Sequence, residues 1–297
     1  MSDANINWFP GHMAKAKKEL MEMVKLVDLV IELKDARIPI SSTNPMVDEI
    51  SISKPRLILL NKANMADDKI TKKWIDYYKN NGIIALDIDC ISKYNIKNIE
   101  KYAHLALKDV FLKRESKGIK SKQIKAMILG IPNVGKSTLI NTLSNKKKTN
   151  VGNKPGVTKI ISWLKVSEDL FILDTPGILW PKFDDNIGYN LALCGSIKDD
   201  ILNIEDVLIN GLNYILINYK ELITKRYDIT EEYEDSRSFI ELVARKKGLL
   251  LQGGKIDFLR CCNMILNDIR LVKVGKMSYE KPNWYLQNWK WFIWFGI

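Results

Sequence analysis

The segment from Gly130 to Ser137 constrains this chain most, because it matches the pattern G-x-x-x-x-G-K-[ST]. An apolar run, Ala126 to Leu129, precedes it, and a helical pattern continues to about Leu143. A glycine-rich turn between a strand and a helix lets backbone N–H groups and the helix N-terminus face phosphate oxygens. A chance strand-turn-helix is the alternative, but the flanking pattern argues against it. The sequence therefore predicts an α/β fold with a phosphate-binding loop.

Individual residues of this loop have expected roles. Lys136 is expected to reach the β- and γ-phosphates of a nucleotide, and the Ser137 hydroxyl to ligate Mg²⁺. After a second apolar run, Asp174 is placed to hold Mg²⁺ through water, and Thr158 to complete the metal shell when a triphosphate is bound. The expected metal ligands are thus Ser137, Thr158 and Asp174. The expected nucleotide contacts on the phosphate side are Asn133, Val134, Gly135, Lys136, Ser137, Thr138 and Gly177.

The segment Asn61-Lys62-Ala63-Asn64 follows the apolar run Leu57 to Leu60 and resembles the N-K-x-D motif that binds guanine. Asn64 stands where the acid is expected. A carboxylate accepts hydrogen bonds from both guanine N1–H and the 2-amino group, whereas an amide offers one acceptor and one donor. We therefore expect GTP binding that is weakened relative to xanthine nucleotides but survives. Asp67 is nearby but out of register.

Apolar periodicity gives the wider organisation. A helical pattern spans Met13 to Val27, and strands and helices then alternate up to residue 173, which predicts a sheet with mostly parallel strands. Residues 113–125 hold six Lys/Arg and are expected to form a connector. From Asn190 to Arg270 the pattern is helical throughout. The expected domains are an α/β domain at 1–180 and an all-helical domain at 181–282, followed by an aromatic tail at 283–297 that packs locally or is poorly ordered, with a membrane-interface role as the alternative.

The net charge of +11 is unevenly distributed. Residues 1–180 carry 30 Lys+Arg against 19 Asp+Glu, and residues 181–297 carry 16 of each. Such an excess favours a polyanionic partner, although it also occurs in proteins that are merely soluble. The four cysteines lack metal-ligand spacing and are expected to be reduced core thiols. The N-terminus does not resemble a signal peptide, and no apolar run is long enough to span a membrane, so we expect a cytoplasmic protein with no stable membrane association. The sequence does not predict the oligomeric state.

The base motif precedes the phosphate loop, which precedes two switch motifs, Pro155-Gly156-Val157-Thr158 and Asp174-Thr175-Pro176-Gly177. This order, with Trp8-Phe9-Pro10-Gly11-His12-Met13, Asp35-Ala36-Arg37-Ile38-Pro39 and Asn44-Pro45, resembles the circularly permuted ribosome-assembly GTPases of the RbgA/YlqF type, over residues 6 to about 282. The resemblance implies a circularly permuted P-loop GTPase domain followed by a helical RNA-binding domain. It also implies GTP and Mg²⁺ as ligands, GTP hydrolysis during late assembly of the large ribosomal subunit, and the precursor of that subunit with its rRNA as partners.

The resemblance also suggests roles for residues that the patterns alone do not assign. Asp89 and Cys90 would complete the base side. His12 would orient or deprotonate water, because Ile178 occupies the position where many GTPases place a glutamine; capping of the first helix is the alternative for His12, and His104 is expected to be structural. Asn133 would help to bind K⁺.

Two other functions stay open: an RNA-binding protein that uses nucleotide structurally, and a non-ribosomal NTPase. Basic groups at Arg245-Lys246-Lys247 and Lys225-Arg226 are candidate phosphate contacts or solvated helix faces.

Overall fold

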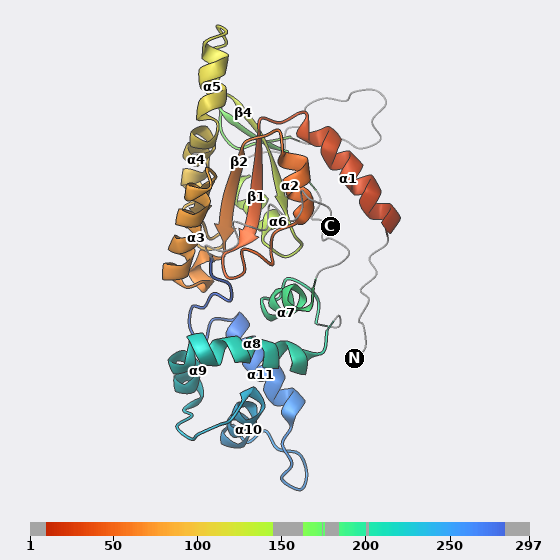
Figure 1. The fold of residues 1–297 in the computed structure, drawn as a ribbon, viewed down its shortest axis with the longest axis vertical. Coiled ribbons are helices and arrows are strands. Elements are labelled where there is room, and N and C mark those ends of the chain that lie inside the picture. The colour runs from red at the N-terminus through yellow and green to blue at the C-terminus, as the bar shows by residue number, and fades with distance from the viewer. Residues whose placement is uncertain (1–9, 145–162, 174, 176–183, 200–201, 283–297) are drawn as a thin grey trace, which may run out of the picture.

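The computed structural model describes residues 10–144, 163–173, 175, 184–199 and 202–282 (Figure 1). The strands within this part of the chain form one six-stranded sheet in the order β3-β2-β1-β4-β6-β5. All neighbours pair in parallel except β5 and β6, which are antiparallel. The strands are β1 Leu29–Asp35, β2 Arg56–Asn61, β3 Ile84–Asp87, β4 Ile124–Gly130, β5 Trp163–Lys165 and β6 Leu170–Leu173.

The central strand β1 is buried along its whole length, as expected for a parallel strand covered on both faces. Alternate side chains of β1 enter different cores. Val30 packs with Leu20 and Val24 of helix α1, whereas Leu29 and Ile31 belong to the larger core on the other face. Helices therefore cover both faces of the sheet, which leaves the ends of the strands as the place for a binding site.

Helices of the sheet-containing part are α1 Pro10–Val24, α2 Pro45–Ser51, α3 Asp68–Asn80, α4 Ile99–Ala106, α5 Lys108–Glu115 and α6 Lys136–Leu143. Helix α3 begins where Asp67 accepts hydrogen bonds from the backbone N–H groups of Lys69 and Ile70.

Two predictions need correction. The connector is shorter than the predicted residues 113–125. Lys113 and Arg114 lie in the last turn of α5, where cations interact favourably with the helix dipole, and Lys125 lies in β4. His12, which was expected in a loop before the helical pattern that starts at Met13, lies in the first turn of α1, since Pro10 starts the helix.

The second part of the chain is helical, with α7 Asp185–Leu193, α8 Ile204–Asn218, α9 Lys220–Tyr227, α10 Ser236–Lys246 and α11 Phe258–Arg270. These helices gather at the end of the molecule where the C-terminal ends of β1 and β2 point (Figure 1). After α11 the chain returns to the first part: the backbone N–H of Tyr279 donates to the Arg37 carbonyl at 2.8 Å, and that of Met277 to the Met65 carbonyl at 3.2 Å. The segment after α11 therefore ties the helical part back to the sheet-containing part by backbone hydrogen bonds.

All four cysteines are free and buried, as predicted. Burial raises the pKa of each thiol to about 12. Among the helices that the structure describes, none combines the length and apolar character needed to cross a bilayer.

Candidate nucleotide-binding site

The phosphate loop joins β4 to α6, as the sequence predicted, and its backbone requires glycine at two motif positions. Gly135 caps α6 with φ +103°, and a Cβ there would lie 2.2 Å from Asn61 Nδ2. A Cβ on Gly130 would lie 2.9 Å from the Leu33 carbonyl oxygen. Ser137 and Thr138 are exposed in the first turn of α6, where backbone N–H groups have no helical partner. The loop therefore fits an anionic ligand at an open helix N-terminus.

Asn61 connects the base motif to the phosphate loop. Its side chain is almost fully buried, with 2% exposed, and Nδ2 donates to the Val134 carbonyl at 2.8 Å. Its Oδ1 accepts from the backbone N–H of Cys90 at 3.2 Å. Thr142 of α6 donates to the Cys90 carbonyl at 3.2 Å. The structure thus brings together three predicted segments, around residues 61, 90 and 134, although they are far apart in the sequence.

The remaining base-motif residues differ in their accessibility. Lys62 has a left-handed backbone with φ +63°, and its Nζ pairs with Asp35 Oδ2 at 2.9 Å. Ala63 is buried and donates its N–H to the Ile88 carbonyl at 3.1 Å. Asn64 is exposed in the short 3₁₀ helix η1, Ala63–Met65. Asn64 is thus the residue of this motif whose side chain is open to a ligand.

Asp89 and Cys90, which follow β3, are both buried. The Asp89 carboxylate accepts from the Ser92 N–H at 2.8 Å, so it stabilises its own loop. Thr175 follows β6 and donates its hydroxyl to the Ile128 carbonyl of β4. These segments all follow the C-terminal ends of parallel strands, the usual place for ligands in such sheets. Asp174, Gly177, Thr158 and the side chain of His12 lie outside the described residues.

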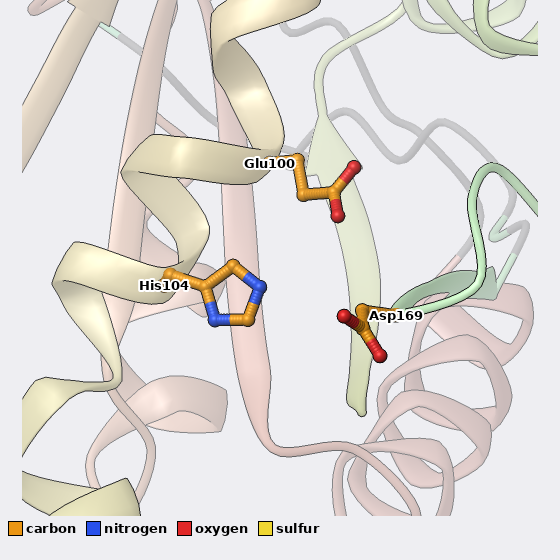
Figure 2. A group of neighbouring side chains, drawn as sticks. All are labelled: Glu100, His104 and Asp169. Carbon is orange, nitrogen blue, oxygen red and sulfur yellow. The ribbon is translucent and has the colours of Figure 1, made fainter. Parts of the chain in front are cut away.

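A separate cluster contains Glu100 and His104 of α4 and Asp169, whose ligand atoms all lie within 4.8 Å of one another (Figure 2). The His104 ring also packs against Phe111, with 5.4 Å between centroids. Asp169 directly precedes β6, so it lies at the opposite end of the parallel strands from the phosphate loop. This cluster is therefore not part of the nucleotide's metal site.

Comparison with known proteins identifies the family. The model of the 50S ribosome-binding GTPase family matches residues 125–246. Ribosome biogenesis GTPase A of Priestia megaterium is 46% identical, covering 94% of this chain and 97% of that protein. Its namesake in Bacillus cereus is 47% identical, covering 93% and 94%. The chain belongs to the ribosome biogenesis GTPase A family.

Solved structures agree with this membership. The crystal structure of GNP-bound YlqF from T. maritima is 30% identical with a TM-score of 0.61, covering 91% of this chain and 99% of that one. Strand β2 with the base motif precedes β4 with the phosphate loop in the chain, which confirms the permuted P-loop GTPase fold. As a ribosome biogenesis GTPase, the chain binds and hydrolyses GTP, with Mg²⁺ as the general companion of such nucleotides.

Proposed function

We propose that this ribosome biogenesis GTPase acts on the precursor of the large ribosomal subunit, contacts its rRNA, and hydrolyses GTP while bound there. One observation carries the nucleotide half of the proposal: Asn61 of the guanine-type motif hydrogen-bonds the phosphate loop at 2.8 Å, so the two halves of a GTP site are assembled. The description of the matching family as 50S ribosome-binding supports the ribosomal half, as does the basic excess in residues 1–180. The proposed partner places the protein in the cytoplasm.

The phosphate side follows from the loop chemistry. Lys136 binds the β- and γ-phosphates, and the Gly177 N–H meets the γ-phosphate. Ser137, Thr158 and Asp174 hold Mg²⁺, which when bound neutralises charge on the β- and γ-phosphate oxygens. Val134, Gly135 and Thr138 contribute backbone N–H groups to the same cradle.

The base side is formed by Asn61, Lys62, Ala63 and Asn64 with Asp89 and Cys90. Asn64 contacts the guanine edge, while the buried residues fix the shape of the pocket.

Catalysis requires a group that positions water, and Ile178 has no polar atom to do so. In this proposal His12 orients or deprotonates the water, because an imidazole titrates near neutral pH. Asn133 would offer its Oδ1 to K⁺, which would supply positive charge near the phosphates; among the described residues, the hydrogen bond of this amide is made by Nδ2. An amide oxygen is a suitable ligand for a hard cation.

The decisive experiment measures GTP turnover with and without purified large ribosomal subunits, in K⁺ and in Na⁺. We expect subunits to raise turnover, and K⁺ to raise it further than Na⁺. Lys136→Ala should abolish triphosphate binding, and His12→Ala should lower turnover while leaving nucleotide affinity unchanged. Turnover that is indifferent to subunits would refute the ribosomal half, and intact turnover in His12→Ala would refute the role of that residue.

A further inference from the structure

The turn that follows α7 has a fixed geometry. Gly195 has φ +69° and donates its N–H to the Ala192 carbonyl at 2.9 Å, while the Ser196 N–H donates to the Leu191 carbonyl at 2.7 Å. This pair of hydrogen bonds is the Schellman motif that ends many helices. We call residues 192–196 the α7 turn. Backbone hydrogen bonds within the turn fix its shape, so a side chain that holds one of its carbonyls holds the whole turn.

Two side chains from the nucleotide-binding part hold the α7 turn. Arg37 Nη2 donates to the Cys194 carbonyl at 2.9 Å. Asn133 Nδ2, from the phosphate loop itself, donates to the Ser196 carbonyl at 3.1 Å. A residue of the loop that wraps the phosphates therefore touches the helical part directly.

The helical part holds the same turn from the other side. Arg270 of α11 donates through Nη2 to the Ala192 carbonyl at 2.5 Å and through Nε to the Leu193 carbonyl at 3.4 Å. The guanidinium also pairs with Asp199 at 2.6 Å. The carbonyls at the end of α7 thus accept hydrogen bonds from two arginines: Arg37 of the sheet-containing part and Arg270 of the helical part.

Asp35 fixes the position of Arg37. Its carboxylate accepts from Arg37 Nε at 2.9 Å and Nη2 at 2.7 Å, and both residues are almost completely buried. Burial alone would raise the pKa of the Asp35 carboxyl, but Arg37 and Lys62 together hold it well below its ordinary value. The carboxylate therefore stays charged, and the guanidinium is kept in the orientation that reaches Cys194.

Asp35 also connects Arg37 to the base motif. Lys62 pairs with the same carboxylate at 2.9 Å and directly follows Asn61, which holds the phosphate loop. The α7 turn is thus linked to the nucleotide site by two routes: directly through Asn133, and through Lys62, Asp35 and Arg37.

We propose that the α7 turn is the joint that couples the nucleotide state to the orientation of the helical part, with Arg37 as a positioning residue. The inference deepens the proposed function and rests on it. Closure of the phosphate loop on a triphosphate moves Asn133, and the α7 turn follows because Arg37 and Asn133 both hold it. Because coupling of binding equilibria is reciprocal, a partner that holds the helical part in one orientation must change the affinity for GTP relative to GDP.

The test measures the distance between two spin labels by pulsed electron resonance, on Lys73→Cys of α3 and Arg260→Cys of α11. Both sites are exposed. The native thiols are buried, with pKa values raised to about 12, and resist labelling. The label distance is compared between GDP and a non-hydrolysable GTP analogue in the full chain. We expect the two nucleotides to give different distances.

The informative variant is Arg37→Lys, which keeps a cation against Asp35 but cannot hold that carboxylate through two nitrogens and also reach the Cys194 carbonyl. The matched control is Arg226→Lys: Arg226 pairs with Asp268 through Nε at 3.0 Å and Nη2 at 2.7 Å, but entirely within the helical part. We expect Arg37→Lys to remove more than half of the nucleotide-dependent distance change, and Arg226→Lys to retain it. Lysine at position 226 should lower stability without affecting coupling.

Two results would refute the proposal that the α7 turn is the joint. One is a spin-label distance in the wild-type chain that is the same with GDP and with the GTP analogue, and the other is a full nucleotide-dependent distance change in Arg37→Lys. If Arg37→Lys does not fold, Arg270→Lys releases the same turn from α11 and must reduce the change in its place. Failure of the proposed function is distinguishable, because it appears as absent GTP turnover or absent stimulation by subunits, whereas failure of the joint leaves both intact.

Discussion

In the guanine-type motif, the side chain of Asn64 is exposed, whereas Asn61 and Ala63 are buried. In the proposed site, its amide therefore contacts the base directly. Asn64→Asp supplies a second acceptor with a full charge, so we expect GTP to bind about tenfold more tightly and XTP more weakly, since a charge-assisted hydrogen bond contributes roughly 1.5–3 kcal/mol. Titration calorimetry with both nucleotides measures the ratio. An unchanged ratio would mean that Asn64 does not face the base.

Ser196 provides a stability prediction at the α7 turn. Its side chain is 1% exposed, and its hydroxyl has no hydrogen-bond partner among the described residues. Removing an unsatisfied buried hydroxyl costs little, so Ser196→Ala should change the free energy of unfolding by less than about 1 kcal/mol, or raise it. Urea unfolding measures the change.

The matched control for Ser196 is Ser236, which is similarly buried but donates to Asn213 Oδ1 at 2.7 Å. Ser236→Ala should lower the free energy of unfolding by about 0.5–1.5 kcal/mol, because it removes a hydrogen bond that contributes roughly this amount. A loss in Ser196→Ala as large as that in the control would show that the Ser196 hydroxyl is bonded in solution.

Among the helices, α9 and α11 are joined by a buried carboxylate. Asp268 accepts from Arg226 and pairs with Lys273 Nζ at 3.1 Å. Burial alone would raise the pKa of Asp268, but these two cations bring it below its ordinary value of 3.8. The native state therefore binds fewer protons than the unfolded state in the acid range. The stability from this group is complete above pH 3.8 and is lost as the pH falls below that value.

Asp268→Asn should lower the free energy of unfolding at pH 7 by about 2 kcal/mol and make it less sensitive to acid. Urea unfolding at pH 7 and at about pH 3 measures both effects. Asp206→Asn, an exposed position in the first turn of α8, is the control and should keep the wild-type acid dependence. An acid dependence in Asp268→Asn equal to that of the wild type would contradict the assignment.

The elements that sequence patterns predicted are those with strong local signals. Helix α3 has the amphipathic spacing and the Asp67 cap, and strand β2 contains the continuous apolar run Leu57 to Leu60. Helices α2 and α5 were not predicted, because they are only seven and eight residues long and α5 buries none of its side chains fully. Short helices depend on tertiary packing more than on local propensity.

The same distinction applies to the site. The phosphate loop is a local motif, so its eight residues identified it. The contacts that assemble the site are not local: Asn61 donates to the Val134 carbonyl 73 residues away, and Arg37 to the Cys194 carbonyl 157 residues away. In both cases the acceptor is a backbone carbonyl, which every residue has, so no residue type at position 134 or 194 signals the contact.

Across the whole molecule, the net positive charge lies in the part that carries the sheet, because the basic and acidic residues of the helical part are equal in number. Lys117, Lys120 and Lys122 are exposed between α5 and β4. In the helical part, by contrast, Arg226 pairs with Asp268, and Lys246 with Asp228 at 3.3 Å. The basic groups of the helical part are thus partly neutralised by their own acids. We therefore expect the segment between α5 and β4 to make more contacts with rRNA phosphates.

Replacing Lys117, Lys120 and Lys122 with Gln should weaken binding to large-subunit precursors and reduce the slope of log affinity against log salt concentration by about 2 to 3, because each phosphate contact contributes roughly 0.7–0.9. The matched triple variant replaces Lys225, Arg245 and Lys247, which are exposed in the helical part. Since both variants remove three charges, net charge alone predicts equal effects. A larger loss of slope in the helical variant would place the phosphate contacts there, and the charge argument would be wrong.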